Sequence, residues 1–277
     1  MSSVFTPAKL IVTLLALPAL IIPACALGYI VYQGSSVISW QFLSSSDALD
    51  GFGNSSGILG QLTGSLLLAL GGCLLATPIA LGAALFYQLQ ASPRQRKLLE
   101  SVLYLLQAIP PIVYGLFGLV LFVHLLAWGV SLLTGMLILA IVVLPALTLN
   151  TITSLQRIAP EYSEAARALG LSDSALVGRV WLRHARLELI TGQLLAMARA
   201  LSETAPILFT ATVFSGVVWP ESLLSPVTTL QTHIFYLAQE GGNPLAIQVA
   251  WGSALVLVAS VALFSLLARK LKSIGEQ

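Results

Sequence analysis

Six long apolar runs constrain this chain more than any other feature of its sequence. Each run is long enough, at about 1.5 Å per residue, to cross the roughly 30 Å hydrocarbon core of a bilayer as a helix. Only 9% of the 277 residues are charged, whereas an average soluble domain has about 25%. A soluble fold of this composition could not cover its surface with polar groups. The sequence therefore predicts an all-α membrane protein with six transmembrane helices. The runs are roughly Leu10–Tyr32, Ile58–Leu89, Leu98–Leu126, Ser131–Thr153, Leu189–Phe214 and Pro244–Ala268.

The basic residues orient these six helices. Of the 13 Lys and Arg, 12 lie before the first run, after the sixth, or in the connections 90–97 and 154–188. The alternating connections, 33–57, 127–130 and 215–243, contain none. Because cytoplasmic loops of membrane proteins are enriched in Lys and Arg, we expect both termini in the cytoplasm. The expected location is the cell inner (plasma) membrane, crossed several times.

The chain divides into three parts on this pattern. Residues 1–57 hold the first transmembrane helix, which we expect to stay uncleaved, and an outer loop rich in Ser and Gly that should be irregular. Residues 58–270 form one membrane core with a charged cytoplasmic loop at 154–188, and residues 271–277 form a cytoplasmic tail. The two cysteines, Cys25 and Cys73, lie in apolar runs and are interpreted as small packing residues.

The cytoplasmic loop contains the signals of a short helix, a turn and a second helix. Pro160-Glu161 suits a helix start, since Pro fits the first turn and an acid there favours the helix dipole. Gly170 is a natural terminator, and Ser172-Asp173 can cap a second helix that runs through Arg186. Small side chains in Ala165-Ala166 would let another surface approach the first helix closely. The loop therefore predicts a contact with a partner, although a solvated connection would need fewer assumptions.

The same loop resembles a known motif. Glu164-Ala165-Ala166, then Gly170, then Val180-Trp181-Leu182 has the order and spacing of the EAA motif in the permease subunits of ABC importers. The chain departs from the motif at Arg183, where the family has Pro. In that family the loop inserts as a coupling helix into a cleft of the ATPase subunit. The resemblance implies that Glu164, Ala165, Ala166 and Gly170 couple this chain to a separate ATPase.

The sequence lacks the motifs of an enzyme. It has no GxxxxGK[ST] phosphate loop, so ATP hydrolysis is expected on another chain. No nucleophile–base pair is visible, and His124, His184 and His233 are far apart with no metal-ligand spacing. We therefore expect a non-enzymatic protein without catalytic residues, metal or cofactor.

Arg199 and Glu203 form the most polar feature of the fifth apolar run. They lie four residues apart, which places them on one face of a continuous helix. A lone Arg at mid-membrane costs about 2.5–3.5 kcal/mol on insertion scales, so it needs a partner or a wet cavity. The two charges either neutralise each other in a structural contact that holds helices together, or they form an anion site in a transport path. Arg suits phosphate or carboxylate, and a nearby carboxylate could accept a hydrogen bond from hydrogen phosphate but not from sulfate.

The residues around this pair resemble a narrower family. The stretch 198–210, Ala-Arg-Ala-Leu-Ser-Glu-Thr-Ala-Pro-Ile-Leu-Phe-Thr, is similar to the fifth helix of the PstA family, one of two permease types in phosphate-specific ABC importers. Ser202 replaces the usual Gly. Weaker matches are Gly57-Ile58, Gly64-Ser65-Leu66 and the stretch Ile109–Gly118. The resemblance implies that Arg199, Glu203 and Thr204 line a phosphate pathway.

The resemblance also implies partners and leaves alternatives. The partners would be a second, PstC-like permease subunit, a dimer of PstB-like ATPase subunits, an extracytoplasmic phosphate-binding protein and the lipid membrane; no nucleic acid is expected. An ABC permease for another oxyanion, such as sulfate or molybdate, is the first alternative. An ATP-independent secondary transporter and a membrane-embedded enzyme are the others.

Overall fold

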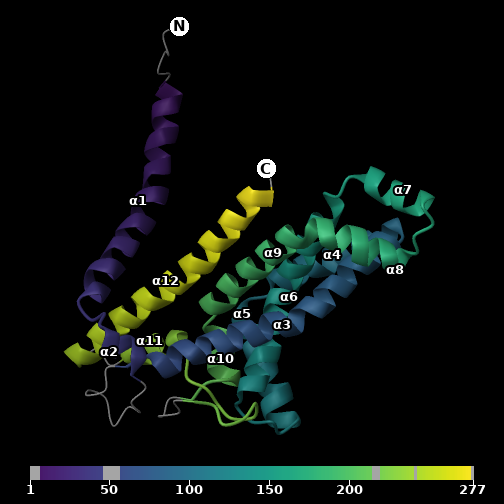
Figure 1. Ribbon diagram of the computed structural model, residues 1–277. Helices are drawn as coiled ribbons and strands as arrows, with labels where there is room; N and C mark the ends of the chain where they lie inside the picture. Colours follow the sequence, from purple (N-terminus) through teal and green to yellow (C-terminus); the bar gives the residue numbers. More distant parts are fainter. Residues whose placement is uncertain (1–6, 46–56, 214–218, 240–241, 276–277) are drawn as a thin grey trace.

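The computed structural model describes residues 7–45, 57–213, 219–239 and 242–275, and this part of the chain is helical (Figure 1). Its only strand-like pairing is a single parallel bridge between Thr212 and Val227. The prediction of an all-α protein is confirmed for these residues. The helices are α1 (Pro7–Ser35), α2 (Trp40–Ser44), α3 (Leu59–Leu89), α4 (Pro93–Ala108), α5 (Pro111–Gly118), α6 (Leu132–Gln156), α7 (Pro160–Ala168), α8 (Asp173–Ala175), α9 (Leu182–Ser202), α10 (Ala205–Thr210), α11 (Leu230–Gln239) and α12 (Pro244–Gly275), with π-helical segments η1 (Leu119–Leu125) and η2 (Leu176–Trp181).

Four helices in the described residues are long and apolar enough to cross a membrane without a break. They are found at Val12–Ser35 in α1, Leu59–Leu89 in α3, Leu132–Gln156 in α6 and Pro244–Ile274 in α12. These agree with four of the six predicted spans. A fifth candidate is the bent pair of α4 with α5 and η1. A membrane protein with several helical spans is therefore confirmed.

The third predicted span is not one continuous helix, and the bend has a local cause. The axes before and after Ile109–Pro110 differ by 88°. A residue before Pro is pushed out of the helical region, and here Ile109 and Pro110 have ψ angles of 126° and 134°. Pro111 then fits the first turn of α5. The predicted span Leu98–Leu126 is therefore made of two helices that meet at a sharp bend.

The fifth predicted span is also interrupted, at Glu203 and Thr204. Pro206 has no backbone N–H for the carbonyl of Ser202 and its ring would crowd that carbonyl. The helix α9 accordingly ends at Ser202, and α10 begins with Pro206 in its first turn. The predicted end of this span, Phe214, lies outside the described residues, as do Ser46 and residues 51–56 of the outer loop expected to be irregular.

The core of the protein lies where α3, α6, α9 and α10 meet. Leu68, Leu139, Val143 and Leu201 from three of these helices are almost fully buried in one cluster with Ile207 of α10. Small residues allow the close packing: a Cβ on Gly72 of α3 would lie 2.9 Å from the Cβ of Leu139 on α6. This agrees with the packing expected of small residues between membrane helices.

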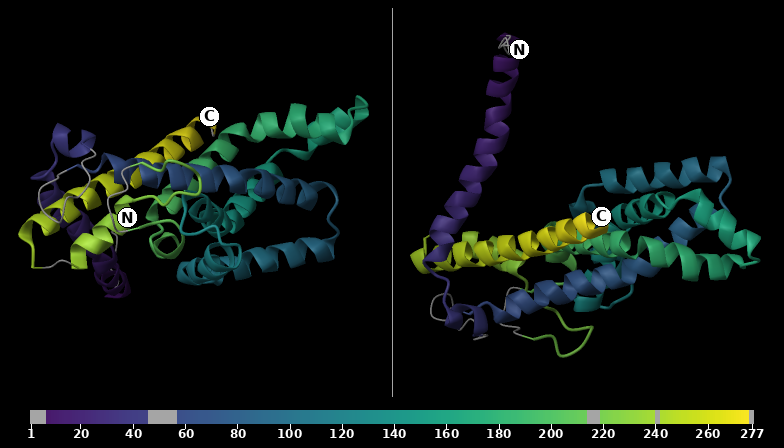
Figure 2. Two further views of the ribbon diagram at one scale, coloured as in Figure 1. Left: turned by 90° about the horizontal axis from the view of Figure 1, so that it is seen from below. Right: turned by 45° about the horizontal axis from the view of Figure 1, so that its top comes forward.

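The helices gather at two ends of the molecule (Figures 1 and 2). One end holds the α3–α4 connection, α7 and α8, and the segments 90–97 and 154–188 there contain most of the basic residues. The other gathers α2, α11 and the start of α12. The predicted connection 215–243 contains a helix, α11, which carries His233. In Figure 1 and in the right-hand view of Figure 2, α1 contacts α12 near this second end and points away from the bundle toward the N-terminus; none of its 18 most hydrophobic consecutive residues is buried.

Candidate functional site

The charged loop folds as its sequence predicts. The helix α7 has Pro160 and Glu161 in its first turn and Arg167 in its last. Gly170 has φ +77°, a left-handed conformation that Gly adopts without strain, and its N–H bonds to the carbonyl of Arg167 at 2.9 Å. Ser172 caps α8, since its hydroxyl accepts from the N–H of Ala175. The predicted order of helix, Gly turn and capped second helix is confirmed.

The adjacent alanines Ala165 and Ala166 differ in exposure. Ala166 is 5% exposed and belongs to a cluster with Leu176 and Trp181 of the following segment. The indole N–H of Trp181 donates to the Ser163 hydroxyl at 3.0 Å, which fixes α7 on the second helix. Ala165 is exposed, as are Glu164 and Leu169. Of the small pair, only Ala165 is available to an approaching surface, because the chain itself covers Ala166.

Arg183, which replaces the Pro of the motif, lies in an uninterrupted helix. The segment η2 continues directly into α9, and the N–H of Leu182 bonds to the carbonyl of Val177 five residues earlier. Arg183 follows in the first turn of α9 and is exposed. Its departure from the motif therefore leaves the helix intact and adds a positive charge to the outside of the loop.

Arg199 and Glu203 meet at the end of α9. The Nε atom of Arg199 lies 3.7 Å from Oε1 of Glu203, and their side chains are 37% and 16% exposed. Glu203 has extended backbone angles, φ −86° and ψ 121°, so it is the first residue beyond the helix. The pairing is as predicted, although the two residues were expected on one continuous helix. Thr204 follows directly and is half-buried, and its side chain does not cap α10.

The interruption between α9 and α10 lies against α5, the helix that follows the bend at Ile109–Pro110. A Cβ on Gly115 of α5 would lie 2.8 Å from the Cα of Pro206, and one on Gly118 would lie 2.9 Å from the Thr210 side chain. The Tyr114 hydroxyl donates to the carbonyl of Leu106 at 2.7 Å and so joins α5 back to α4. Two interrupted helices therefore pack together next to the charged pair. Interrupted helices of this kind form ion and substrate sites in many transporters.

A buried polar network ties α11 to the same break. The amide nitrogen of Gln231 donates to the carbonyl of Leu201 at 2.6 Å, and its oxygen accepts from the Ser65 hydroxyl at 2.8 Å. The Ser65 hydroxyl also accepts from the N–H of Leu230 at 2.9 Å. Sequence analysis missed Gln231, because a polar residue in a connection gives no signal of burial.

Comparison with known proteins decides the family. Residues 76–273 match the family described as "Binding-protein-dependent transport system inner membrane component". This chain belongs to that family. It is 32% identical to the probable ABC transporter permease protein YqgI of Bacillus subtilis (strain 168), over 94% of this chain and 93% of that protein.

Two further relatives carry the name "Phosphate transport system permease protein". PstA 2 of Mycobacterium bovis is 28% identical over 87% of this chain and 78% of that protein. PstA of Xylella fastidiosa (strain Temecula1) is 32% identical over 78% and 74%. Among solved structures, the MetNI methionine ABC transporter in inward-facing conformations has a chain with TM-score 0.57 and 16% identity, covering 79% of this chain and 94% of that one. That likeness establishes the fold alone.

Family membership accounts for both sequence resemblances. The chain is a multi-pass inner-membrane permease subunit of an ABC transporter. It belongs to a family of transport proteins rather than enzymes, in which ATP hydrolysis resides on a separate subunit. Within the described residues, no three His, Cys, Asp or Glu side chains are placed to share a metal ion. The charged loop and the pair at the broken helix are thus the two candidate sites of a permease.

Proposed function

We propose that this chain is a permease subunit of an ATP-driven phosphate importer. The observation that carries the proposal is the Arg199–Glu203 pair at the interrupted end of α9, in a chain whose relatives include two phosphate transport permeases. We infer six membrane crossings with both termini in the cytoplasm. The bent α4–α5 pair is then the third crossing and the broken α9–α10 segment the fifth.

The charged pair has the chemistry needed to distinguish hydrogen phosphate from a fully ionised anion. The guanidinium of Arg199 offers several N–H donors to oxyanion oxygens. Glu203 repels an anion, yet its oxygens accept a hydrogen bond from a protonated phosphate oxygen. Hydrogen phosphate supplies that proton at neutral pH and sulfate does not. Arg199, Glu203 and Thr204 therefore form the proposed substrate path.

The remaining surfaces suit the partners of such an importer. One chain encloses only half of a central path, so we propose that a second, similar permease covers the exposed side of α9. A dimer of ATPase subunits binds α7 through Glu164, Ala165 and the Gly170 turn, and its closure switches the helices between inward- and outward-facing states. An extracytoplasmic phosphate-binding protein delivers the anion at the end that carries α2 and α11.

Uptake of labelled phosphate into cells that carry the importer tests this proposal. Arg199→Ala should reduce uptake at least tenfold, because it removes a charge-assisted interaction with the anion worth about 1.5–3 kcal/mol. Glu203→Gln should also reduce uptake strongly, because the neutral amide oxygen is a weaker acceptor for the phosphate proton than a carboxylate. Arg94→Ala, an exposed position on α4, is the matched control and should retain uptake. Co-purification of the ATPase should be the same for all variants.

Three results would contradict the proposal. Normal uptake by both variants would make the pair a structural contact. Full competition by unlabelled sulfate or molybdate would indicate an importer of another oxyanion. Uptake that continues without ATP and follows an ion gradient would indicate a secondary transporter.

A further inference from the structure

The carbonyl of Leu106, in the last turn of α4, lacks its usual helical partner. In a continuous helix this carbonyl would accept a hydrogen bond from the N–H four residues later, and that residue is Pro110, which has none. The Tyr114 hydroxyl supplies the missing bond at 2.7 Å. A side chain of α5 therefore takes the place of a backbone donor across the 88° bend.

This hydrogen bond belongs to the bent arrangement alone. In a straight helix Leu106 and Tyr114 would lie eight residues, or about 12 Å, apart along the axis, which is too far for the bond. The Tyr114 ring is buried and packs with Ile138 and Val142 of α6, so its position is fixed by a second helix. Because a carbonyl without a partner is costly within a membrane, the Tyr114 bond stabilises the bend.

Tyr114 also lies next to the charged pair. The following residue, Gly115, is the point where α5 approaches the backbone of Pro206 most closely. Arg199 interacts electrostatically with the Tyr114 phenol, so the two side chains lie near each other. The bend at α4–α5 therefore decides how α5 sits against the interruption that carries Glu203.

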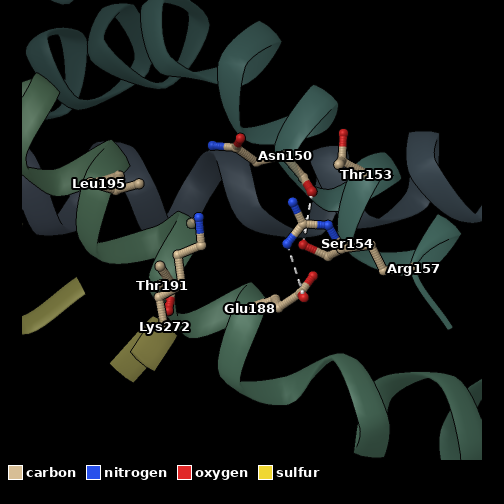
Figure 3. A pocket seen from close by; sticks show the side chains of 9 residues that line it. Asn150, Thr153, Ser154, Arg157, Glu188, Thr191, Leu195 and Lys272 are labelled. Atoms are coloured by element: carbon tan, nitrogen blue, oxygen red, sulfur yellow. Dashed lines mark hydrogen bonds and ion pairs between the residues drawn. The ribbon is translucent and has the colours of Figure 1, made fainter. Parts of the chain in front are cut away.

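The α9 side of the same site is held by other contacts. The Thr77 hydroxyl of α3 donates to the Gln193 side chain at 2.9 Å. Nearer the basic end, Nη1 of Arg157 lies 3.2 Å from Oε1 of Glu188, and the two side chains point toward each other at the edge of a pocket between α6 and α9 (Figure 3). Contacts with α3 and α6 thus hold α9 along its length, whereas the position of α5 depends on the bond across the bend.

We propose that Tyr114 is a positioning residue of the phosphate site. Its hydroxyl holds α4 and α5 in the bent arrangement, which keeps α5 against Pro206 and keeps Arg199 and Glu203 in the geometry that binds the anion. The single O–H of Tyr114 is used on the Leu106 carbonyl, so Tyr114 acts on the anion through the charged pair. The inference rests on the proposed function, since the site is the proposed phosphate site.

Phosphate binding to the purified importer complex tests this role. Tyr114→Phe keeps the ring and removes only the hydroxyl. The complex in dodecyl maltoside is titrated with ³²P-labelled inorganic phosphate by equilibrium dialysis, without the external binding protein and without nucleotide. We expect the apparent affinity to fall severalfold, and at most about tenfold, because one lost hydrogen bond makes the bent, binding-competent state less populated. Tyr104→Phe, which removes the hydroxyl of an exposed Tyr on α4, should bind like the parent.

Spin labels across the bend measure its geometry independently of phosphate. Leu98→Cys on α4 and Val120→Cys in η1 are exposed positions and are labelled in a background without other cysteines. At 1.5 Å per residue, the helix axes at these positions would be about 23 Å apart across the 88° bend and about 33 Å apart in a straight helix. Electron–electron double resonance should show longer distances in Tyr114→Phe than in the parent or in Tyr104→Phe.

The outcomes separate this role from the proposed function. If the unchanged importer neither takes up nor binds phosphate, the proposed function fails and the positioning role fails with it. If the unchanged importer binds phosphate and Tyr114→Phe binds it equally well, the positioning role is refuted and the importer stands, even where the variant melts at a lower temperature. Weaker binding with unchanged distances would indicate that Tyr114 contacts the anion directly, and would also overturn the proposal.

Discussion

At the residue scale, Gln231 is the side chain that joins the outer helix α11 to the break in α9. It is 4% exposed and bonds to both Ser65 and the carbonyl of Leu201. Gln231→Leu removes both bonds and leaves that buried carbonyl without this partner. We expect a loss of about 1–2 kcal/mol in stability, with a melting temperature in detergent lower by roughly 2–6 °C.

The control for this prediction lies on the same helix. Gln239→Leu changes an exposed residue at the end of α11 and should leave the melting temperature within about 1 °C of the parent, since surface changes usually cost little. Equal melting temperatures for the two variants would show that the Gln231 network does not hold α11 in place.

Gly115 allows the two interrupted helices to pack together. A methyl group there would lie 2.8 Å from the Cα of Pro206 and 3.1 Å from its carbonyl oxygen, so backbone has to move. We expect Gly115→Ala to lose about 1–3 kcal/mol, the usual cost of overpacking, and to reduce phosphate uptake because the Arg199 site shifts. Thermal unfolding and uptake measured on the same preparation check this.

Gly82→Ala is the matched control, since a Cβ at Gly82 of α3 meets no atom within 4 Å. Ala has the higher helix propensity, so this variant should be as stable as the parent or slightly more stable. If Gly115→Ala behaves in the same way, the close approach of α5 and α10 does not matter to stability.

At the scale of single elements, the proposed coupling role of α7 depends on its Gly turn. Gly170 has φ +77°, where an Ala costs about 1–2 kcal/mol. Gly170 is exposed and a Cβ there would meet no other atom, so an Ala at this position would not disturb packing. Its backbone strain would instead change the conformation of the turn and, with it, the direction of α7. Gly170→Ala should therefore reduce co-purification of the ATPase several-fold, whereas Gly178→Ala, also open to solvent, should not. Unchanged co-purification for both would mean that α7 does not bind the ATPase through this turn.

The proline pattern explains how much of the helix layout can be predicted. Every apolar run was visible in the sequence, and so was each Pro within one. Pro78 and Pro145 lie inside the unbroken helices α3 and α6, whereas Pro110 and Pro206 mark breaks. Each of these prolines lacks a backbone N–H, and only Pro110 is followed by a second Pro. Neighbouring helices decide whether a helix bends or continues, and one sequence does not reveal those neighbours.

In the candidate sites, too, features set by nearby residues could be predicted and features set by distant contacts could not. The local fold of the charged loop could be predicted in detail, because caps, Pro and Gly act within a few residues. The Arg199–Glu203 contact could also be predicted, because four residues separate the partners. The pairing of Arg157 with Glu188 and the burial of Gln231 depend on contacts between elements 30 or more residues apart, which the spacing along the chain does not encode.

At the scale of the whole molecule, the distribution of Lys and Arg predicts that the basic end lies in the cytoplasm and that the bent pair crosses the membrane. If α4 and α5 crossed the membrane, connections 90–97 and 154–188 would both lie inside, as the rule for positive residues requires. If the pair turned back to the side it entered from, connection 127–130, which has no Lys or Arg, would lie inside and the five Arg of 154–188 would lie outside. The charge distribution therefore favours a crossing.

Single cysteines test this topology in a background with Cys25→Ala and Cys73→Ala. The variants Gln90→Cys, Ser174→Cys, Glu221→Cys and Ser273→Cys all place the thiol at an exposed position. With six crossings, a membrane-impermeant maleimide should label only Glu221→Cys in intact cells, and the other three after permeabilisation.

A re-entrant α4–α5 pair predicts a different pattern from the same four variants. Gln90→Cys would stay protected in intact cells, since it precedes the pair, but every later position would change sides. Ser174→Cys and Ser273→Cys would then be labelled and Glu221→Cys would not. Such a result would place α7 outside the cell, where no ATP drives transport, and would contradict the coupling role of the loop along with the six crossings.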